Sequence, residues 1–316
     1  MFVFAHIGRA AGTTFRYVLR RNFRDRLLPI HSHLIKEHFG ADRITPRTNK
    51  LTDEELTQIL NCYPGIECIS GHFFCFPNRF DNFKVMTILR DPVERVVSHY
   101  LSFRRKYLDL NVDEFPDHMK YDFRYDINLF FKHCDYVSSK YGVANSCVNG
   151  QTWSLDSNMN LDQAINRLKN DFFFVGLVEK FDEGLLILSE QFRELGRSFD
   201  IMYETQDVAS SVVDGVRYMS QRKAVKIQKK AKETLITDNI RKKIKEMNQM
   251  DYILYEEAKK LFNERLSQYQ GDVKADLYNY RRQLRQWKLK NRLYGPLKVS
   301  QVKSSINWLK GKISGN

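Results

Sequence analysis

Short apolar runs alternate along the chain with longer stretches in which apolar residues recur three and four positions apart. A short apolar run is typical of a buried β-strand, and the three-to-four spacing is typical of an amphipathic helix. The expected strands are residues 1–7, 66–69, 84–90 and 172–177, and the expected helices are 15–23, 52–60, 91–101, 161–168, 183–192 and 237–266. Strands that alternate with helices predict an α/β fold with a mainly parallel sheet flanked by helices.

The helix expected after residue 90 has the best-defined start. Asp91 can cap it, Pro92 suits its first turn, and Glu94 completes a capping box. One apolar stripe then faces the core, formed by Val93, Val96, Val97, Tyr100 and Leu101. Thr52 and Glu55 predict a similar capping box at the start of the helix 52–60.

Composition divides the chain near residue 270. We expect residues 1–270 to form a single domain, with an aromatic-rich, poorly periodic excursion over the surface at about 106–160. Residues 271–316, called the tail below, hold seven Lys and four Arg against two Asp, which gives +9 of the chain's net charge of +13. The tail is expected to be a basic helical extension, either a solvated helix or an attractor for a polyanion or an anionic membrane surface.

The cysteines and histidines give no sign of a metal site. The five cysteines are an odd number without a Cys-x-x-Cys pair, which predicts neither a disulfide framework nor a zinc site and favours a reducing compartment; they are Cys62, Cys68, Cys75, Cys134 and Cys147. His31, His33 and His38 have no carboxylate or cysteine at ligand spacing.

The chain shows no sequence signal for a membrane or for export. No apolar run is long enough to span a membrane, and residues 1–7 indicate a strand rather than a signal peptide because no basic region precedes them. We therefore expect a cytoplasmic protein.

The turn between the first strand and the first helix has the composition of a phosphate-binding loop. Its residues are Gly8, Arg9, Ala10, Ala11, Gly12, Thr13 and Thr14. Small residues let the backbone approach a ligand, and the amides at a helix amino terminus attract anions. Arg9 adds a positive charge and the threonines add hydroxyls. The alternative is a tight turn without a ligand.

This loop lacks the lysine that nucleotide triphosphatases place before the magnesium-binding Ser or Thr. Gly12 is followed directly by Thr13, and no acidic residue ends the next strands. The loop therefore suits a phosphate donor that is handled without a metal.

A second basic element follows the strand 84–90. Arg90 ends that strand, at the edge where α/β sheets bind ligands, and Ser98 lies on the next helix away from its apolar stripe. The two side chains are placed to bind a second phosphate. The alternative is a salt bridge beside a solvated serine.

Together these stretches resemble the sulfotransferases that use 3'-phosphoadenosine 5'-phosphosulfate (PAPS). The branch is the glycan branch, which includes heparan sulfate 2-O- and 6-O-sulfotransferases and bacterial relatives. Four stretches carry the resemblance and a fifth is similar more weakly; they are His6–Thr14, Ser70–His72, Thr87–Tyr100, Phe174–Asp182 and, more weakly, Asn248–Tyr255.

The resemblance implies a P-loop-like core and a role for each site residue. Residues Arg9, Ala10, Ala11, Gly12, Thr13 and Thr14 would bind the 5'-phosphosulfate, and Arg90 and Ser98 would bind the 3'-phosphate. His72 would be the catalytic base, and Arg9 would stabilise charge on the leaving oxygen. The family has lysine where this chain has Arg9 and proline where it has Gly8, which bears on how the leaving group is positioned.

The reaction expected from the resemblance is sulfuryl transfer to an acceptor hydroxyl of a carbohydrate, with 3',5'-ADP as product and no metal. A P-loop small-molecule kinase is the first alternative. The second is a nucleic-acid-binding protein that uses the basic tail. It is suggested by the pI of the whole chain, near 9.4, and by the Arg and aromatic residues at 278–287. It leaves the paired phosphate motifs unexplained. The sequence does not identify the acceptor or the oligomeric state.

Overall fold

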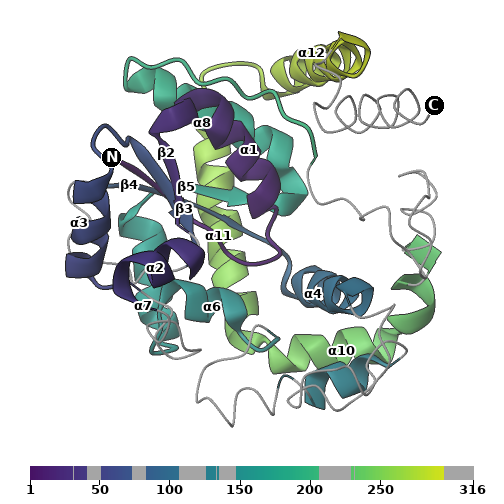
Figure 1. Cartoon of the computed structure of the whole chain (residues 1–316). Coiled ribbons are helices and arrows are strands. Elements are labelled where there is room, and N and C mark those ends of the chain that lie inside the picture. Colours follow the sequence, from purple (N-terminus) through teal and green to yellow (C-terminus); the bar gives the residue numbers. More distant parts are fainter. Residues whose placement is uncertain are drawn as a thin grey trace, which may run out of the picture.

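A parallel β-sheet lies at the centre of the molecule (Figure 1). The computed structural model describes residues 1–30, 32–40, 51–72, 83–106, 126–132, 134, 147–205, 229–230 and 232–294. In this part of the chain the strand order is β2-β3-β1-β4-β5, and every neighbouring pair is parallel. The strands are β1 (Phe2–Ala5), β2 (Leu27–Ile30), β3 (Cys68–Gly71), β4 (Lys84–Leu89) and β5 (Phe172–Leu177). The predicted α/β fold with a parallel sheet is confirmed.

Helices cover both faces of the sheet. The helices in the described part of the chain are α1 (Gly12–Phe23), α2 (Ser32–Phe39), α3 (Asp53–Cys62), α4 (Pro92–Lys106), α6 (Gly150–Leu155), α7 (Leu161–Asn170), α8 (Phe181–Glu194), α10 (Asp238–Met247), α11 (Gln249–Ser267) and α12 (Val273–Tyr294). Alternate strand residues face opposite ways, so Phe2 and Phe4 pack with α1, α8 and α11, whereas Val3 and Ala5 pack with α2 and α3. Every residue of β1 is buried because it lies between these two layers.

The predicted capping box of α3 is confirmed in full. Thr52 Oγ1 accepts a hydrogen bond from Glu55 N at 3.2 Å, and Glu55 Oε2 accepts one from Thr52 N at 2.9 Å.

The capping box predicted for α4 is half wrong. Asp91 Oδ1 accepts from Glu94 N at 3.0 Å as expected, but the Asp91 amide donates to Glu179 Oε1 at 3.1 Å. The Glu94 carboxylate instead pairs with Lys232 at 2.6 Å and Arg241 at 3.0 Å. Two cations from distant parts of the chain therefore bind this carboxylate, and an ion pair with two full positive charges outweighs one bond to a backbone amide.

Three other features differ from the sequence prediction. The edge strand β2 was missed, because Pro29 lies within it and proline is tolerated only at sheet edges and strand ends. The helical region 237–266 is not continuous but divides at Asn248 into α10 and α11. The strand expected at 66–69 also begins two residues later, at Cys68.

The C-terminal helix α12 packs against the body of the protein. Tyr280 and Leu284 are buried in the main core, and Tyr280 Oη donates to Ile201 O at 2.8 Å. Arg281 pairs with Asp182 at 2.7 Å near the start of α8. The described part of the tail is therefore a docked helix, and residues 295–316 lie outside the described residues.

Most of the excursion expected at 106–160 also lies outside the described residues. Its last part does not run over the surface. Gly150, Gln151, Thr152 and Leu155 of α6 are all buried, because this short helix packs between α7 and α11.

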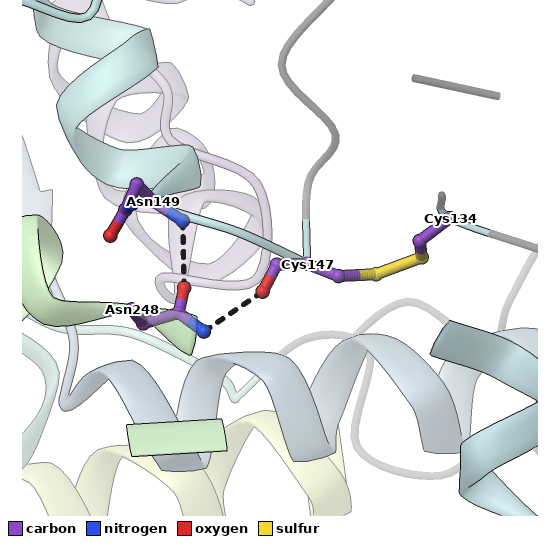
Figure 2. The surroundings of a disulfide bond; sticks show 4 residues. All are labelled: Cys134, Cys147, Asn149 and Asn248. Atoms are coloured by element: carbon purple, nitrogen blue, oxygen red, sulfur yellow. Dashed lines mark hydrogen bonds between the residues drawn. A yellow bond between two sulfur atoms is a disulfide. The ribbon is translucent and has the colours of Figure 1, made fainter. Parts of the chain in front are cut away.

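A disulfide between Cys134 and Cys147 corrects the cysteine prediction (Figure 2). Cys62 and Cys68 are free, and Cys75 lies outside the described residues. An odd number of cysteines does not exclude one disulfide, so the cysteine count no longer supports a reducing compartment. No helix within the described ranges is sufficiently long and apolar to cross a bilayer.

Candidate active site

The carboxyl ends of three neighbouring strands meet at one edge of the sheet. Ala5, the last residue of β1, is in register with Gly71 of β3 and Thr87 of β4. The residues that follow these strands include His6, His72 and Arg90. Ligands of open α/β sheets bind at this edge, where neighbouring connections turn to opposite sides.

The loop after β1 presents backbone amides at this edge. Arg9 and Ala11 have positive φ angles of 67° and 55°, which turn the chain sharply into α1. Ala11 forms the N-cap of α1 without a side-chain hydrogen bond, so no capping side chain covers the amides of the first turn. Thr13 is exposed and Thr14 is buried. An anion at this helix terminus would meet N–H groups and the positive end of the helix dipole.

Gly12 is needed for the loop to pack against His6. A Cβ at residue 12 would lie 1.8 Å from the His6 ring, so any side chain there would displace the imidazole. The sequence prediction gave Gly12 a role in approaching the ligand, and the structure adds this contact with His6.

Arg9 and Arg90 connect the two predicted phosphate-binding elements. Arg9 Nε donates to Ser98 Oγ at 3.3 Å, and Arg90 Nη1 donates to the Arg9 carbonyl at 3.1 Å. Ala10 is buried beneath the turn. The structure thus brings Arg9, Arg90 and Ser98 together, although they come from β-strand ends and a helix far apart in sequence.

Arg90 is a cation taken partly out of water. Burial lowers its pKa, the nearby Arg9 acts in the same direction, and the carboxylates of Glu179 and Glu94 oppose both. Within the described part of the chain, Arg90 Nε is buried without a hydrogen-bond partner. An anion bound here would regain the solvation that Arg90 has lost, so the residues present fit a phosphate group.

His72 lies on the other side of β1 and is exposed. Its ring stacks on that of His6, with centroids 3.9 Å apart and an angle of 30° between the ring planes. The ring of His38, by contrast, packs on Tyr63 at the end of α3 and does not lie at the carboxyl edge of the sheet. His72 is therefore the exposed imidazole at the carboxyl edge within the described residues.

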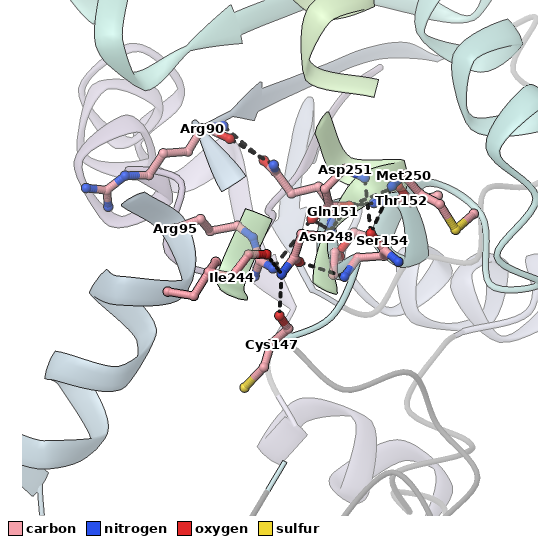
Figure 3. Close-up of polar contacts among 12 residues, drawn as sticks. Arg90, Arg95, Cys147, Gln151, Thr152, Ser154, Ile244, Asn248, Met250 and Asp251 are labelled. Carbon is pink, nitrogen blue, oxygen red and sulfur yellow. Dashed lines mark hydrogen bonds and ion pairs between the residues drawn. The ribbon is translucent and has the colours of Figure 1, made fainter. Parts of the chain in front are cut away.

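Three residues that support the site were not identified from the sequence: Gln151, Asp251 and Glu179. Gln151 hydrogen-bonds to both backbone groups of Arg90, and Asp251 holds Gln151 (Figure 3). Glu179 holds the Asp91 amide. Glu179 lies in Phe174–Asp182, one of the stretches that carry the family resemblance, and Asp251 lies in the more weakly similar Asn248–Tyr255, so the resemblance was the available signal. Gln151 had none.

Comparison with known proteins finds relatives with one activity. No model of a protein family matches the chain. Heparan-sulfate 6-O-sulfotransferase 3 of Mus musculus is 25% identical over 302 residues, which is 84% of this chain and 58% of the relative. The Homo sapiens protein of the same name is 24% identical over 302 residues, with the same two shares. Heparan-sulfate 6-O-sulfotransferase 3-B of Danio rerio is 25% identical over 292 residues, 84% of this chain and 64% of the relative. The chain spans about 58% to 64% of the length of these curated relatives.

Proposed function

We propose that this chain, a relative of the glycan sulfotransferases, transfers a sulfuryl group from PAPS to a hydroxyl of a carbohydrate. The relationship rests on the matches over 84% of the chain. The donor, the role of each residue and the acceptor are the proposal.

One observation carries it: the two elements that are predicted to bind phosphate lie side by side at the carboxyl edge of the sheet. The loop amides before α1 suit the 5'-phosphosulfate, and the Arg90 and Ser98 side chains suit a second phosphate. The link from Arg9 to Ser98 places the two elements within the length of one arginine side chain. A nucleotide with separate 5' and 3' phosphates fits this arrangement, whereas an ordinary nucleotide would leave one element without a ligand.

The chemistry is an in-line displacement at sulfur. The acceptor oxygen forms a bond to sulfur while the bond from sulfur to the bridging oxygen of the donor breaks, and 3',5'-ADP leaves. His72 takes the proton from the attacking hydroxyl, since a neutral imidazole is a good base near pH 7. Arg9 and the loop amides stabilise the negative charge that grows on the bridging oxygen.

A glycan acceptor is proposed because the relatives are named for sulfotransfer to heparan sulfate. A sulfated or carboxylated glycan is a polyanion, and it would be attracted by the chain's net charge of +13.

Calorimetry with three probes tests the donor site. We expect 3',5'-ADP to bind more tightly than ATP, and an oligonucleotide to bind only weakly at 150 mM salt. Preference for ATP would favour the kinase alternative, and tight, salt-sensitive binding of the oligonucleotide would favour the nucleic-acid alternative. Incubation with PAPS and desulfated heparan sulfate, read by mass spectrometry, then tests transfer itself.

The exposed face of α12 should matter for an anionic acceptor and not for the donor. Arg282, Arg285 and Lys290 are exposed on this helix. Changing all three to Gln should raise the KM for heparan sulfate several-fold and flatten its dependence on salt, while the Kd for 3',5'-ADP stays constant. Substitution is a better test than deletion of the whole tail, because removing α12 would expose the core around Tyr280 and Leu284.

A matched control removes the same charge from another surface. Lys242, Lys245 and Arg265 are also exposed, on α10 and α11. If their triple change to Gln raises the acceptor KM equally, the effect comes from net charge alone and the α12 face has no special role. If neither triple change affects KM, α12 is a structural helix.

A further inference from the structure

Gln151 is a fully buried side chain whose amide group binds the backbone of a single residue. Its Oε1 accepts from Arg90 N at 2.9 Å and its Nε2 donates to Arg90 O at 2.8 Å, and the residue is 0% exposed. Arg90 comes directly after β4, where the pairing with β5 ends at Leu89. The Gln151 side chain therefore continues the hydrogen bonding of the strand for one more residue, and fixes the Arg90 backbone.

Gln151 is itself held by a buried carboxylate. Asp251 is 0% exposed and accepts from Gln151 N at 3.0 Å, from Thr152 N at 2.8 Å and from Thr152 Oγ1 at 2.9 Å (Figure 3). These are the first amides of α6, which otherwise have no partner within their helix. A charged acceptor makes each of these bonds stronger than a neutral one would be.

The residue just before α6 also binds the first amides of α11. Asn149, just before α6, accepts through Oδ1 from Met250 N at 3.1 Å and from Asp251 N at 3.2 Å in the first turn of α11. Each helix thus caps the start of the other. Asn248 adds a third link, since its Oδ1 accepts from Asn149 N at 2.8 Å and its Nδ2 donates to Cys147 O at 2.9 Å (Figure 2).

Arg95 completes the support. It is 2% exposed and lies 3.5 Å from the Asp251 carboxylate, and a Cβ on Gly150 would come within 3.0 Å of both its terminal nitrogens. The cluster is therefore closely packed around Asp251, and a shift of α6 would break several hydrogen bonds together. The many hydrogen bonds that share the Asp251 carboxylate make α6 a rigid attachment for the Gln151 side chain.

We infer that Gln151 is a positioning residue for 3'-phosphate recognition, acting through the backbone of Arg90. The inference rests on the proposed function, in which Arg90 binds that phosphate. Gln151 does not touch the ligand. It fixes the backbone from which the long Arg90 side chain extends, and a guanidinium binds a phosphate well only when its paired N–H groups are aligned with the oxygens.

The test compares Gln151→Met with the unchanged protein in calorimetric titrations of 3',5'-ADP and 5'-AMP. Methionine has nearly the same length but cannot pair with a backbone amide or carbonyl. We expect the Kd for 3',5'-ADP to rise about tenfold, part of the full value of a charge-assisted contact, while the Kd for 5'-AMP changes less than about twofold.

Gln191→Met is the matched control. Gln191 is another buried glutamine, and its Nε2 donates to a strand carbonyl, Phe173 O, at 2.7 Å. Phe173 lies at the amino end of β5, away from the proposed site. This variant should lose thermal stability in the same way and keep the unchanged protein's ratio of the two nucleotide affinities.

A double-mutant cycle with Arg90→Ala separates the inference from the proposed function. If Gln151 acts through Arg90, Gln151→Met adds no further loss of 3',5'-ADP affinity once Arg90 is alanine. If the unchanged protein does not prefer 3',5'-ADP to 5'-AMP, the proposed donor site is wrong. If Arg90→Ala loses this preference and Gln151→Met keeps it, the donor site stands and Gln151 has no positioning role.

Gln151→Glu provides the test if the methionine variant does not fold. Its carboxylate still accepts from Arg90 N but cannot donate to Arg90 O. We expect the same selective loss for 3',5'-ADP, and equal losses for both nucleotides would overturn the inference.

Discussion

Arg90→Ala should weaken the binding of 3',5'-ADP roughly 10- to 150-fold and leave the binding of 5'-AMP nearly unchanged, since a charge-assisted hydrogen-bonded contact contributes about 1.5–3 kcal/mol. The two nucleotides differ only by the 3'-phosphate, so the comparison isolates the group that Arg90 is proposed to bind. Calorimetry gives the Kd of each nucleotide for the variant and for the unchanged protein, and the ratio of the two Kd values measures the effect. The same variant should raise the KM for PAPS more than it lowers kcat, because the 3'-phosphate is remote from the reacting sulfur.

The surroundings of Arg90 explain why the loss should be large. Its guanidinium is partly desolvated, with burial as the main cause of a lowered pKa and Arg9 adding to it. Its side chain has 23% of its surface exposed, and Glu94 lies 4.0 Å away on the helix that follows. A phosphate dianion would relieve both the desolvation of Arg90 and the repulsion from Arg9. A solvated arginine in the same place would gain much less.

Two measurements guard against an indirect effect. Arg90 Nη1 also donates to the Arg9 carbonyl, so the substitution removes one contact of the loop, and 5'-AMP affinity reports any damage there. Arg167→Ala is a matched control, because Arg167 also donates to a carbonyl, Leu155 O at 3.1 Å, and lies 3.8 Å from a carboxylate, that of Asp156. Equal weakening of both nucleotides by Arg90→Ala would remove Arg90 from the 3'-phosphate role.

The parts of the fold that were predicted from sequence are those with a local signal. The apolar stripe of α4 predicted its buried face, with Val93, Val96, Val97 and Tyr100 in the core. Thr52 and Glu55 lie three residues apart and fixed the start of α3. The strand β4 was predicted because it is buried on both faces and therefore reads as one apolar run.

The parts that were missed depend on contacts between distant residues. Gln151 meets Arg90 across 61 residues of sequence, and Asp91 meets Glu179 across 88. A glutamine in a polar stretch has the same appearance whether it is solvated or buried, because periodicity reports apolar residues and not hydrogen-bond partners. The Cys134–Cys147 pair was missed for a similar reason, since cysteine spacing does not give the distance between the two side chains.

The candidate site falls between these two cases. From the sequence, Arg90 was placed at the ligand-binding edge and the loop with Arg9 and Gly12 directly after a strand, and the carboxyl ends of parallel strands lie at one edge. The contact between Arg9 and Ser98 was not predictable, since it depends on how α4 leaves the sheet. Sequence thus located the edge, and the structure supplied the contacts within it.

His72→Ala should lower kcat by about 10²- to 10⁴-fold, the usual contribution of a positioned proton transfer, with little change in the Kd for 3',5'-ADP. The histidine follows β3 at the carboxyl edge, on the far side of β1 from Arg90, so its loss should not disturb the nucleotide phosphates. In the unchanged protein kcat should rise with pH through about 6–7, the range in which a histidine gives up its proton, because only the neutral imidazole accepts one. The variant should lose this rise.

Two further histidine variants make the assignment specific. His38→Ala removes an imidazole that also packs on an aromatic ring, that of Tyr63, and it should keep both kcat and the pH profile. His6→Gln tests the imidazole stacked on His72. If His6→Gln removes the rise with pH while a folded His72→Ala protein keeps most of its turnover on a true acceptor, the general base is His6 and not His72. If His72→Ala alone removes the rise, proton transfer occurs at the exposed ring after β3.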